Sequence, residues 1–300
     1  MKKRGLAGLI RMLVILLISF LIILSLIFTL GWKQQTEAQI CHESVVIRAS
    51  TLVDETHTVD TPLSCKTKKI CITSGGKHDC DEDFLGEEYD TIKISGKNKE
   101  EKQDAINKII AEKLEECWWM MGGSQKLNVY GREAYTKQHC NICSRIAFSQ
   151  ELQTEFNNKL EGTNKKFLTQ ESKYTDGKVW EFVTNNPTNY MEGYSEETDY
   201  KDMSQKAIVF VEYDMAKIYE WATKGGIVLV ASFTPIVGPV VGAGIGGAIA
   251  ESEGVGDKIG EYLTKIMNKK EKNIAGSVMF INYNKKALRD MECTSFEGKL

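Results

Sequence analysis

Residues 207–214 (AIVFVEYD) and 277–284 (SVMFINYN) are two similar apolar segments, and they decide how we expect the chain to fold. Each is rich in β-branched or aromatic residues and ends in a tyrosine followed by an acid or an amide, as a buried strand ends at a turn. We therefore expect the two segments to form strands that pair with each other in one sheet. The residues between them, 214–274, are then an insertion between neighbouring strands.

The insertion contains 26 consecutive uncharged residues, 225–250 (GGIVLVASFTPIVGPVVGAGIGGAIA). Three glycines spaced four residues apart lie on one helical face, which lets a second helix approach closely in a membrane. Two prolines divide the segment into halves. The segment therefore predicts a glycine-rich helical hairpin with these helix or membrane contacts: Gly238, Gly242, Gly246, Pro235 and Pro239.

The composition of this hairpin is compatible with three placements. Each half is too short to cross a hydrocarbon layer of roughly 30 Å, so one placement is a hairpin that dips into a single leaflet. A second is a hairpin buried in the core of an exported domain. In the third, the segment crosses the membrane once and returns about fifty residues to the cytoplasm, which makes the protein two-pass.

Residues 12–32 (MLVILLISFLIILSLIFTLGW) form another long apolar segment, with 21 residues and no charge. At about 1.5 Å per residue, a helix of this length crosses the hydrocarbon core. The segment lacks the shorter apolar core and the small-residue cleavage site of a signal peptide. Four bases lie on its N-terminal side and favour a cytoplasmic N-terminus: Lys2, Lys3, Arg4 and Arg11. We therefore predict an uncleaved, single-pass anchor in the cell membrane, with the bulk of the chain outside.

The charge balance disfavours one class of partner. The chain has 38 basic and 41 acidic side chains, for a net charge of −3, and four of the bases lie in the N-terminal tail. The remainder is therefore more acidic still, whereas a nucleic-acid-binding protein needs an excess of lysine and arginine to neutralise phosphates. We expect no nucleic-acid partner.

All the cysteines follow the anchor, and an even number of cysteines in an exported segment is typical of a disulfide framework. The sequence does not choose among the possible pairings of these eight: Cys41, Cys65, Cys71, Cys80, Cys117, Cys140, Cys143 and Cys293. Zinc is a competing interpretation, because Cys140 and Cys143 have knuckle spacing and follow His139. A zinc site of that type needs two close pairs, and this chain has one.

Two further motifs are candidate sites. Cys140 and Cys143 also have the spacing of a thiol–disulfide redox centre. The spacing of Asp79, Asp81 and Asp83 is similar to that of a calcium loop, although Phe84 stands where such a loop needs glycine. A solvated acidic turn is the competing interpretation, so we expect no metal site.

Short β-branched segments and one long amphipathic segment predict the remaining elements. We expect strands over 44–50, 68–74, 89–95 and 143–148, and a helix over 98–121. Asn98 can cap this helix, apolar residues recur along one face of it, and Gly122-Gly123 ends it. We expect Cys117 and the adjacent tryptophans to pack on the strands, with Cys117 cross-linked to one of them.

The combination of motifs resembles uncharacterised, N-terminally anchored, cysteine-containing archaeal membrane proteins with a glycine-rich hairpin. The motifs that carry the resemblance are Cys-Trp-Trp at 117–119, Cys-x-x-Cys-Ser-Arg at 140–145, and Cys-Thr at 293–294, together with the anchor and the hairpin. The resemblance carries over no activity.

We therefore expect an α+β fold: an N-terminal transmembrane helix, a disulfide-stapled exported domain with an antiparallel or mixed sheet and packed helices, and a glycine-rich helical hairpin. The expected regions are a cytoplasmic tail (1–11), the anchor (12–32), a cysteine-rich α+β region (33–149), a polar, tyrosine-rich region (150–206) with a helix near 150–160 followed by irregular chain, and the strand pair with its insertion (207–300).

The hypothesis for function is a non-enzymatic extracytoplasmic protein, with no cofactor, that contacts a partner or the membrane through the glycine-rich hairpin. Its expected partners are the lipid bilayer, another membrane or envelope protein, or a second copy of the chain. The alternative is an exported thiol–disulfide oxidoreductase that uses Cys140 and Cys143.

Overall fold

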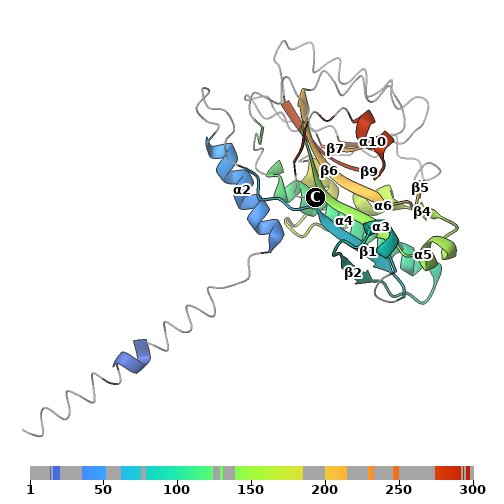
Figure 1. The fold of residues 1–300 in the computed structure, drawn as a ribbon, viewed down its shortest axis with the longest axis horizontal. Coiled ribbons are helices and arrows are strands. Elements are labelled where there is room, and N and C mark those ends of the chain that lie inside the picture. Colours follow the sequence, from blue (N-terminus) through green and yellow to red (C-terminus); the bar gives the residue numbers. More distant parts are fainter. Residues whose placement is uncertain are drawn as a thin grey trace, which may run out of the picture.

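The computed structural model describes residues 14, 16–20, 36–51, 62–75, 79–123, 129–130, 139–184, 200–214, 229–232, 246–249, 274–291, 293 and 295–297. These residues form an α+β fold, as expected (Figure 1). Its helices are α2 (Glu37–Thr51), α3 (Asp81–Phe84), α4 (Lys99–Met120), α5 (Gln150–Glu155), α6 (Thr163–Thr169), α7 (Val179–Thr184) and α10 (Lys285–Asp290). Its strands are β1 (Lys68–Thr73), β2 (Asp90–Lys93), β3 (His139–Phe148), β4 (Lys159–Glu161), β5 (Tyr200–Asp202), β6 (Lys206–Asp214), β7 (Leu229–Ser232), β8 (Gly246–Ile249), β9 (Ile274–Asn282) and β10 (Ser295–Glu297).

The larger sheet is mixed, and its strands lie in the order β2-β1-β3-β6-β9-β7-β8. β1 pairs in parallel with β2 and β3, whereas β3, β6, β9, β7 and β8 pair antiparallel in turn. β10 pairs in parallel with the first residues of β3, and β1 pairs with its last residues. A separate antiparallel pair, β4 and β5, lies outside this sheet.

The predicted pairing of the two similar apolar segments is confirmed. β6 and β9 run antiparallel, from the Lys206–Asn282 pair at one end to the Asp214–Ile274 pair at the other. Most of the side chains between these ends are buried, so the pair forms the middle of the sheet.

The long helix is also confirmed. The Asn98 side chain accepts a hydrogen bond from the Glu101 N–H (2.8 Å), which caps the first turn of α4. Gly122, with φ +69°, follows the helix in the left-handed region that favours glycine. The apolar face of α4 is buried in the main core, where its residues include Ile106, Ile110 and Leu114.

The side chains of β1 alternate between the two faces of the sheet and pack in two different clusters. Ile70 and Ile72 contribute to the main core, which α2, α4, α6 and α7 share. Cys71 points to the other side, where it packs with Phe84 of α3 and with Ala147. The sheet is therefore covered on both faces at this point.

The strand predicted over 44–50 is wrong, because these residues belong to helix α2. Their β-branched residues favoured a strand, but the buried positions of α2 recur with helical spacing: Ala38, Cys41, Val45 and Arg48. Packing of this one face against α4 overrides the local preference.

The helical hairpin is wrong for those parts of the glycine-rich segment that the structure describes. Residues 229–232 and 246–249 form strands β7 and β8, which pair antiparallel from Leu229–Ile249 to Ser232–Gly246. β7 also pairs with β9, so backbone groups at that edge of β9 are bonded within the sheet. Gly246 therefore lies in a strand. Pro235, Gly238, Pro239 and Gly242 lie outside the described residues.

The tyrosine-rich region is more regular than expected. The helix predicted near 150–160 is present as α5, but the irregular chain expected after it contains α6, α7 and two short strands instead. The hydrogen bond from the Asn107 side chain to the Glu161 carbonyl (2.6 Å) and the α4–α6 contacts hold this region on α4.

Most of the predicted anchor lies outside the described residues. Val14 and residues 16–20 are helical, and their large apolar side chains are half-exposed or more. Within the described part of the chain, no helix combines the length and apolar character needed to cross a membrane.

Candidate functional site

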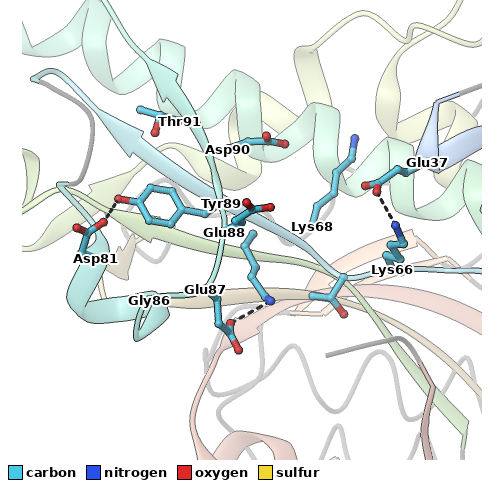
Figure 2. Close-up of a pocket in the computed structure, with 12 residues that line it drawn as sticks. Glu37, Lys66, Lys68, Asp81, Gly86, Glu87, Glu88, Tyr89, Asp90 and Thr91 are labelled. Atoms are coloured by element: carbon cyan, nitrogen blue, oxygen red, sulfur yellow. Dashed lines mark hydrogen bonds and ion pairs between the residues drawn. The ribbon is translucent and has the colours of Figure 1, made fainter. Parts of the chain in front are cut away.

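A cleft of about 880 Å³ opens between the start of β1 and the chain that leads into β2 (Figure 2). β1 extends beyond the first residue of β2, because Asp90 pairs with Ile70 and leaves Lys68 and Lys69 without a β2 partner. The cleft is lined by Glu37, Lys66, Thr67, Lys68, Lys69, Asp81, Gly86, Glu87, Glu88, Tyr89, Asp90 and Thr91. Glu37 is the first residue of α2, so the cleft also borders the helix that follows the predicted anchor.

The lysines of the cleft are paired with carboxylates. Lys66 pairs with Glu37 (3.1 Å), as Figure 2 shows, and Lys69 pairs with Glu87 (3.0 Å). Hydrogen bonding from Lys69 is the main cause that lowers the pKa of Glu87. Lys68 pairs with Glu116 on α4 (3.0 Å). Each of the three lysines that line the cleft therefore has a carboxylate partner.

Glu88 and Asp90 are the cleft carboxylates for which the described part of the chain provides no ion pair. Tyr89, between them, donates a hydrogen bond to Asp81 (2.5 Å) and stacks on Phe84. The lining therefore has five carboxylates and three lysines, and this surplus of negative charge suits contact with a cationic group.

All eight predicted disulfide candidates are paired. The bonds are Cys41–Cys65, Cys71–Cys80, Cys117–Cys143 and Cys140–Cys293. The expected cross-link of Cys117 to a strand is confirmed, because Cys143 belongs to β3. The zinc interpretation of Cys140 and Cys143 fails, since both sulfurs are oxidised.

Cys140 and Cys143 do not have the arrangement of a thiol–disulfide redox centre. Cys140 and Cys143 are bonded to different partners, and both lie within strand β3 rather than at a helix N-terminus. Both are buried, at 0% and 2% exposure. The motif therefore joins two separate parts of the chain to β3.

The calcium candidates take other roles. Asp79 accepts a hydrogen bond from Thr73 (2.5 Å), Asp81 accepts one from Tyr89, and Asp83 follows Asp81 in α3. Among the described residues, no three histidine, cysteine or acidic side chains are placed to hold a metal ion.

Four aromatic rings form a continuous stack across the helical side of the domain. His42 on α2 stacks on Trp119 (4.4 Å between centroids), Trp119 on Tyr174 (5.1 Å), and Tyr174 on Phe182 of α7 (5.3 Å). The His42 Nδ1 atom also lies 2.8 Å from the Trp119 carbonyl. The rings cover one another's faces, so this arrangement joins α2, α4 and α7 and accounts for one tyrosine of the polar region.

A buried polar cluster lies where α2 meets the sheet, and the sequence interpretation missed it. Glu212 on β6 is opposite His139 on β3 in the sheet register, and both are buried. Tyr130 stacks on His139 (4.3 Å), and the Arg48 guanidinium lies 5.1 Å from the centre of the Tyr130 ring. The one pointer in the sequence is the glutamate inside the apolar segment 207–214.

Glu212 is the centre of this cluster. Its Oε2 atom accepts a hydrogen bond from the Val129 N–H (3.1 Å), while Oε1 has no hydrogen-bond partner among the residues that the structure describes. Burial raises the pKa of Glu212 to about 8, against the opposing effects of the Val129 and Tyr130 backbone N–H groups and the Arg48 charge. The carboxyl is therefore mostly protonated at neutral pH.

Comparison of the chain with protein-family models, with curated proteins and with solved structures finds no match.

Proposed function

We propose that this chain is a membrane-anchored, extracytoplasmic binding protein without enzymatic activity. The observation that carries the proposal is the complete pairing of the eight cysteines in four bonds within the chain. Such a framework persists in an oxidising compartment and is rare in the cytosol. An anchor at 12–32 with bases on its N-terminal side is the arrangement that exports the chain after it.

A single-pass topology is favoured over the two-pass alternative. β6 and β9 pair along their length, and Cys293 is bonded to Cys140. The chain before and after the glycine-rich segment therefore belongs to one sheet, which supports placing both on the same side of the membrane.

Within this function, the glycine-rich segment makes the contact with a membrane or with a neighbouring membrane protein. β7 and β8 bring its ends together at one edge of the sheet, with Ser232 opposite Gly246. The uncharged residues 233–245 between them contain Pro235, Gly238, Pro239 and Gly242. An uncharged apolar segment at a sheet edge, carried by a rigid domain, suits insertion into a lipid interface.

Replacing Val241 by glutamate tests this contact, because a charged side chain opposes transfer of an apolar segment into lipid. Residues 33–300 are expressed with and without Val241→Glu, and liposome binding and leakage are measured beside the melting temperature. Lost binding at an unchanged melting temperature supports the contact. A wild-type domain that ignores liposomes, combined with a variant that melts earlier, means that the segment is ordinary core and that this part of the proposal is wrong.

The redox alternative has a separate test. If Cys140 and Cys143 act only in structural bonds, the purified protein has a reduction potential below roughly −300 mV and does not catalyse thiol–disulfide exchange. A potential near that of known oxidoreductases, roughly −120 to −270 mV, together with catalysed exchange, favours the oxidoreductase instead.

A further inference from the structure

Helix α2 is held to the rest of the domain by two different kinds of contact. Its N-terminal half is attached covalently by the Cys41–Cys65 bond, and the stacking of His42 on Trp119 adds a non-covalent contact. Its C-terminal half is held by Val45, which is 0% exposed in the main core, and by Arg48, which is 6% exposed and lies over the Tyr130 ring. Arg48 therefore connects this half of α2 to the buried polar cluster.

The parts of this cluster come from four segments that are distant in the chain. Arg48 lies on α2, Tyr130 follows α4, His139 lies on β3 and Glu212 lies on β6. The guanidinium, the phenol and the imidazole form a stack, and Glu212 binds the backbone beside Tyr130. Glu212 is therefore connected to Arg48 through residues 129–130.

We propose that this cluster is a proton-dependent latch, closed while Glu212 is protonated and loosened when Glu212 loses its proton, which holds the C-terminal half of α2 on the sheet. The carboxylic acid gives its proton to solvent and leaves a carboxylate in a fully buried site. A buried carboxylate is stable only when it is paired and hydrogen-bonded. Loss of the proton therefore favours a state in which the site is open to water.

The groups that face Glu212 favour opening over a closed ion pair. Among the described residues, the titratable or charged groups in the cluster are Arg48, Tyr130 and His139, and the β9 residue opposite Glu212 is Gly276. The Arg48 charge opposes the effect of burial on the Glu212 pKa but does not outweigh it. The guanidinium already rests on the face of Tyr130, and Glu212 is bonded to the Val129 N–H.

The latch gives the chain a response to the pH outside the cell, and it does not depend on what the glycine-rich segment binds. α2 begins five residues after the predicted anchor ends at Trp32. An open latch frees the end of α2 that is distant from the anchor, while the disulfide keeps the near end attached. The domain then changes its attachment to α2 between acidic and alkaline surroundings.

Hydrogen exchange of the full-length protein in detergent tests the latch. Protection factors, corrected for the intrinsic exchange rate at each pH, are measured for α2 amides 44–50 at pH 6 and pH 9. With Glu212 titrating near pH 8 when closed and near 4.5 when open, protection in the wild type should fall by roughly 10- to 100-fold. Glu212→Gln, which stays neutral, should keep its protection across this range.

Two comparisons separate the latch from general unfolding. Amides of α4 in the same molecule should keep their protection at pH 9, and Glu43→Gln, an exposed change on α2 itself, should behave as the wild type does. If Glu212→Gln fails to fold, the wild-type contrast between α2 and α4 still decides the question. Equal loss of protection in α2 and α4, or greater protection of α2 at pH 9, overturns the proposal.

Discussion

Cys140, near the start of β3, is bonded to Cys293, which lies 153 residues later in the chain. The bond brings the C-terminal segment back to the middle of the sheet, where β10 pairs with the same part of β3. Cys71 and Cys80, by contrast, are only nine residues apart. The two bonds therefore constrain the unfolded chain to very different degrees.

The longer loop should make the larger contribution to stability. In the chain-entropy account, removing Cys140–Cys293 as a double serine variant costs about 5 kcal/mol, and removing Cys71–Cys80 costs about 2.5 kcal/mol. Equilibrium unfolding in urea under non-reducing conditions measures both. A larger loss from the Cys71/Cys80 variant contradicts this ranking and indicates that local packing, rather than loop closure, decides the contribution of these bonds.

Gly123 should tolerate no side chain. A Cβ atom at this position lies 2.2 Å from the Trp118 ring, and Trp118 is 1% exposed in the main core. Gly123→Ala should destabilise the protein by about 1–3 kcal/mol through overpacking. Gly75→Ala is the control, because the atoms nearest its Cβ are carboxylate oxygens of Asp79 (2.9 Å) and Glu151 (3.0 Å) rather than a buried ring, so its melting temperature should fall less than that of Gly123→Ala. Equal melting temperatures for the two variants contradict the prediction.

The buried lysine of β6 should depend on its partner. Lys206 is 1% exposed, and its Nζ lies 2.9 Å from the Asp202 Oδ1 atom. Asp202→Asn leaves this cation with only neutral partners, and because the Asp202 side chain is 38% exposed we expect a loss of about 1–2 kcal/mol rather than that of a fully buried pair. Glu37→Gln breaks an exposed pair with Lys66 and should cost less than about 0.5 kcal/mol. Denaturant unfolding at pH 7 compares the two, and an equal cost contradicts the prediction.

The same pair predicts a loss of stability in acid. Burial alone would raise the pKa of Asp202, but hydrogen bonds from Ser204 and Lys206 and the Lys206 charge outweigh burial and lower it to about 2. Because this pKa lies below its usual value of 3.8, the contribution is complete above about pH 3.8 and is lost as the pH falls toward 2. Asp202→Asn should show a weaker dependence of unfolding free energy on pH in this window. An unchanged dependence means that other carboxyl groups cause the acid sensitivity.

The parts of the fold that the sequence predicts are those with a clear period. Apolar residues recur with a helical period along α4, and the segments of β6 and β9 have similar apolar patterns. The helix and the strand pair that these patterns predict are both confirmed. α2 was mistaken for a strand because Val45 and Ile47 favour strands locally, whereas its packing on α4 has a helical period. β7 and β8 were mistaken for helices because glycine spacing does not reveal the open edge of β9.

The candidate sites were less predictable, because they join residues from distant segments. The cleft combines the start of α2 with two strands, and the latch combines four segments, so no local motif marks either. The Cys140–Cys143 spacing was misleading for the same reason, since each sulfur is bonded far along the chain. Only the even number of cysteines pointed to the observed framework.

The central claim is that one oxidised, disulfide-stapled domain lies outside the membrane, and thiol labelling of intact cells tests it most directly. Cells are treated with a membrane-impermeant thiol reagent before and after a membrane-impermeant reductant, and peptides are identified by mass spectrometry. We predict no labelled cysteine before reduction and labelling of Cys293, the partly exposed partner of the buried Cys140, after it. Labelling of Cys293 without reduction, or only after cell lysis, would contradict the account.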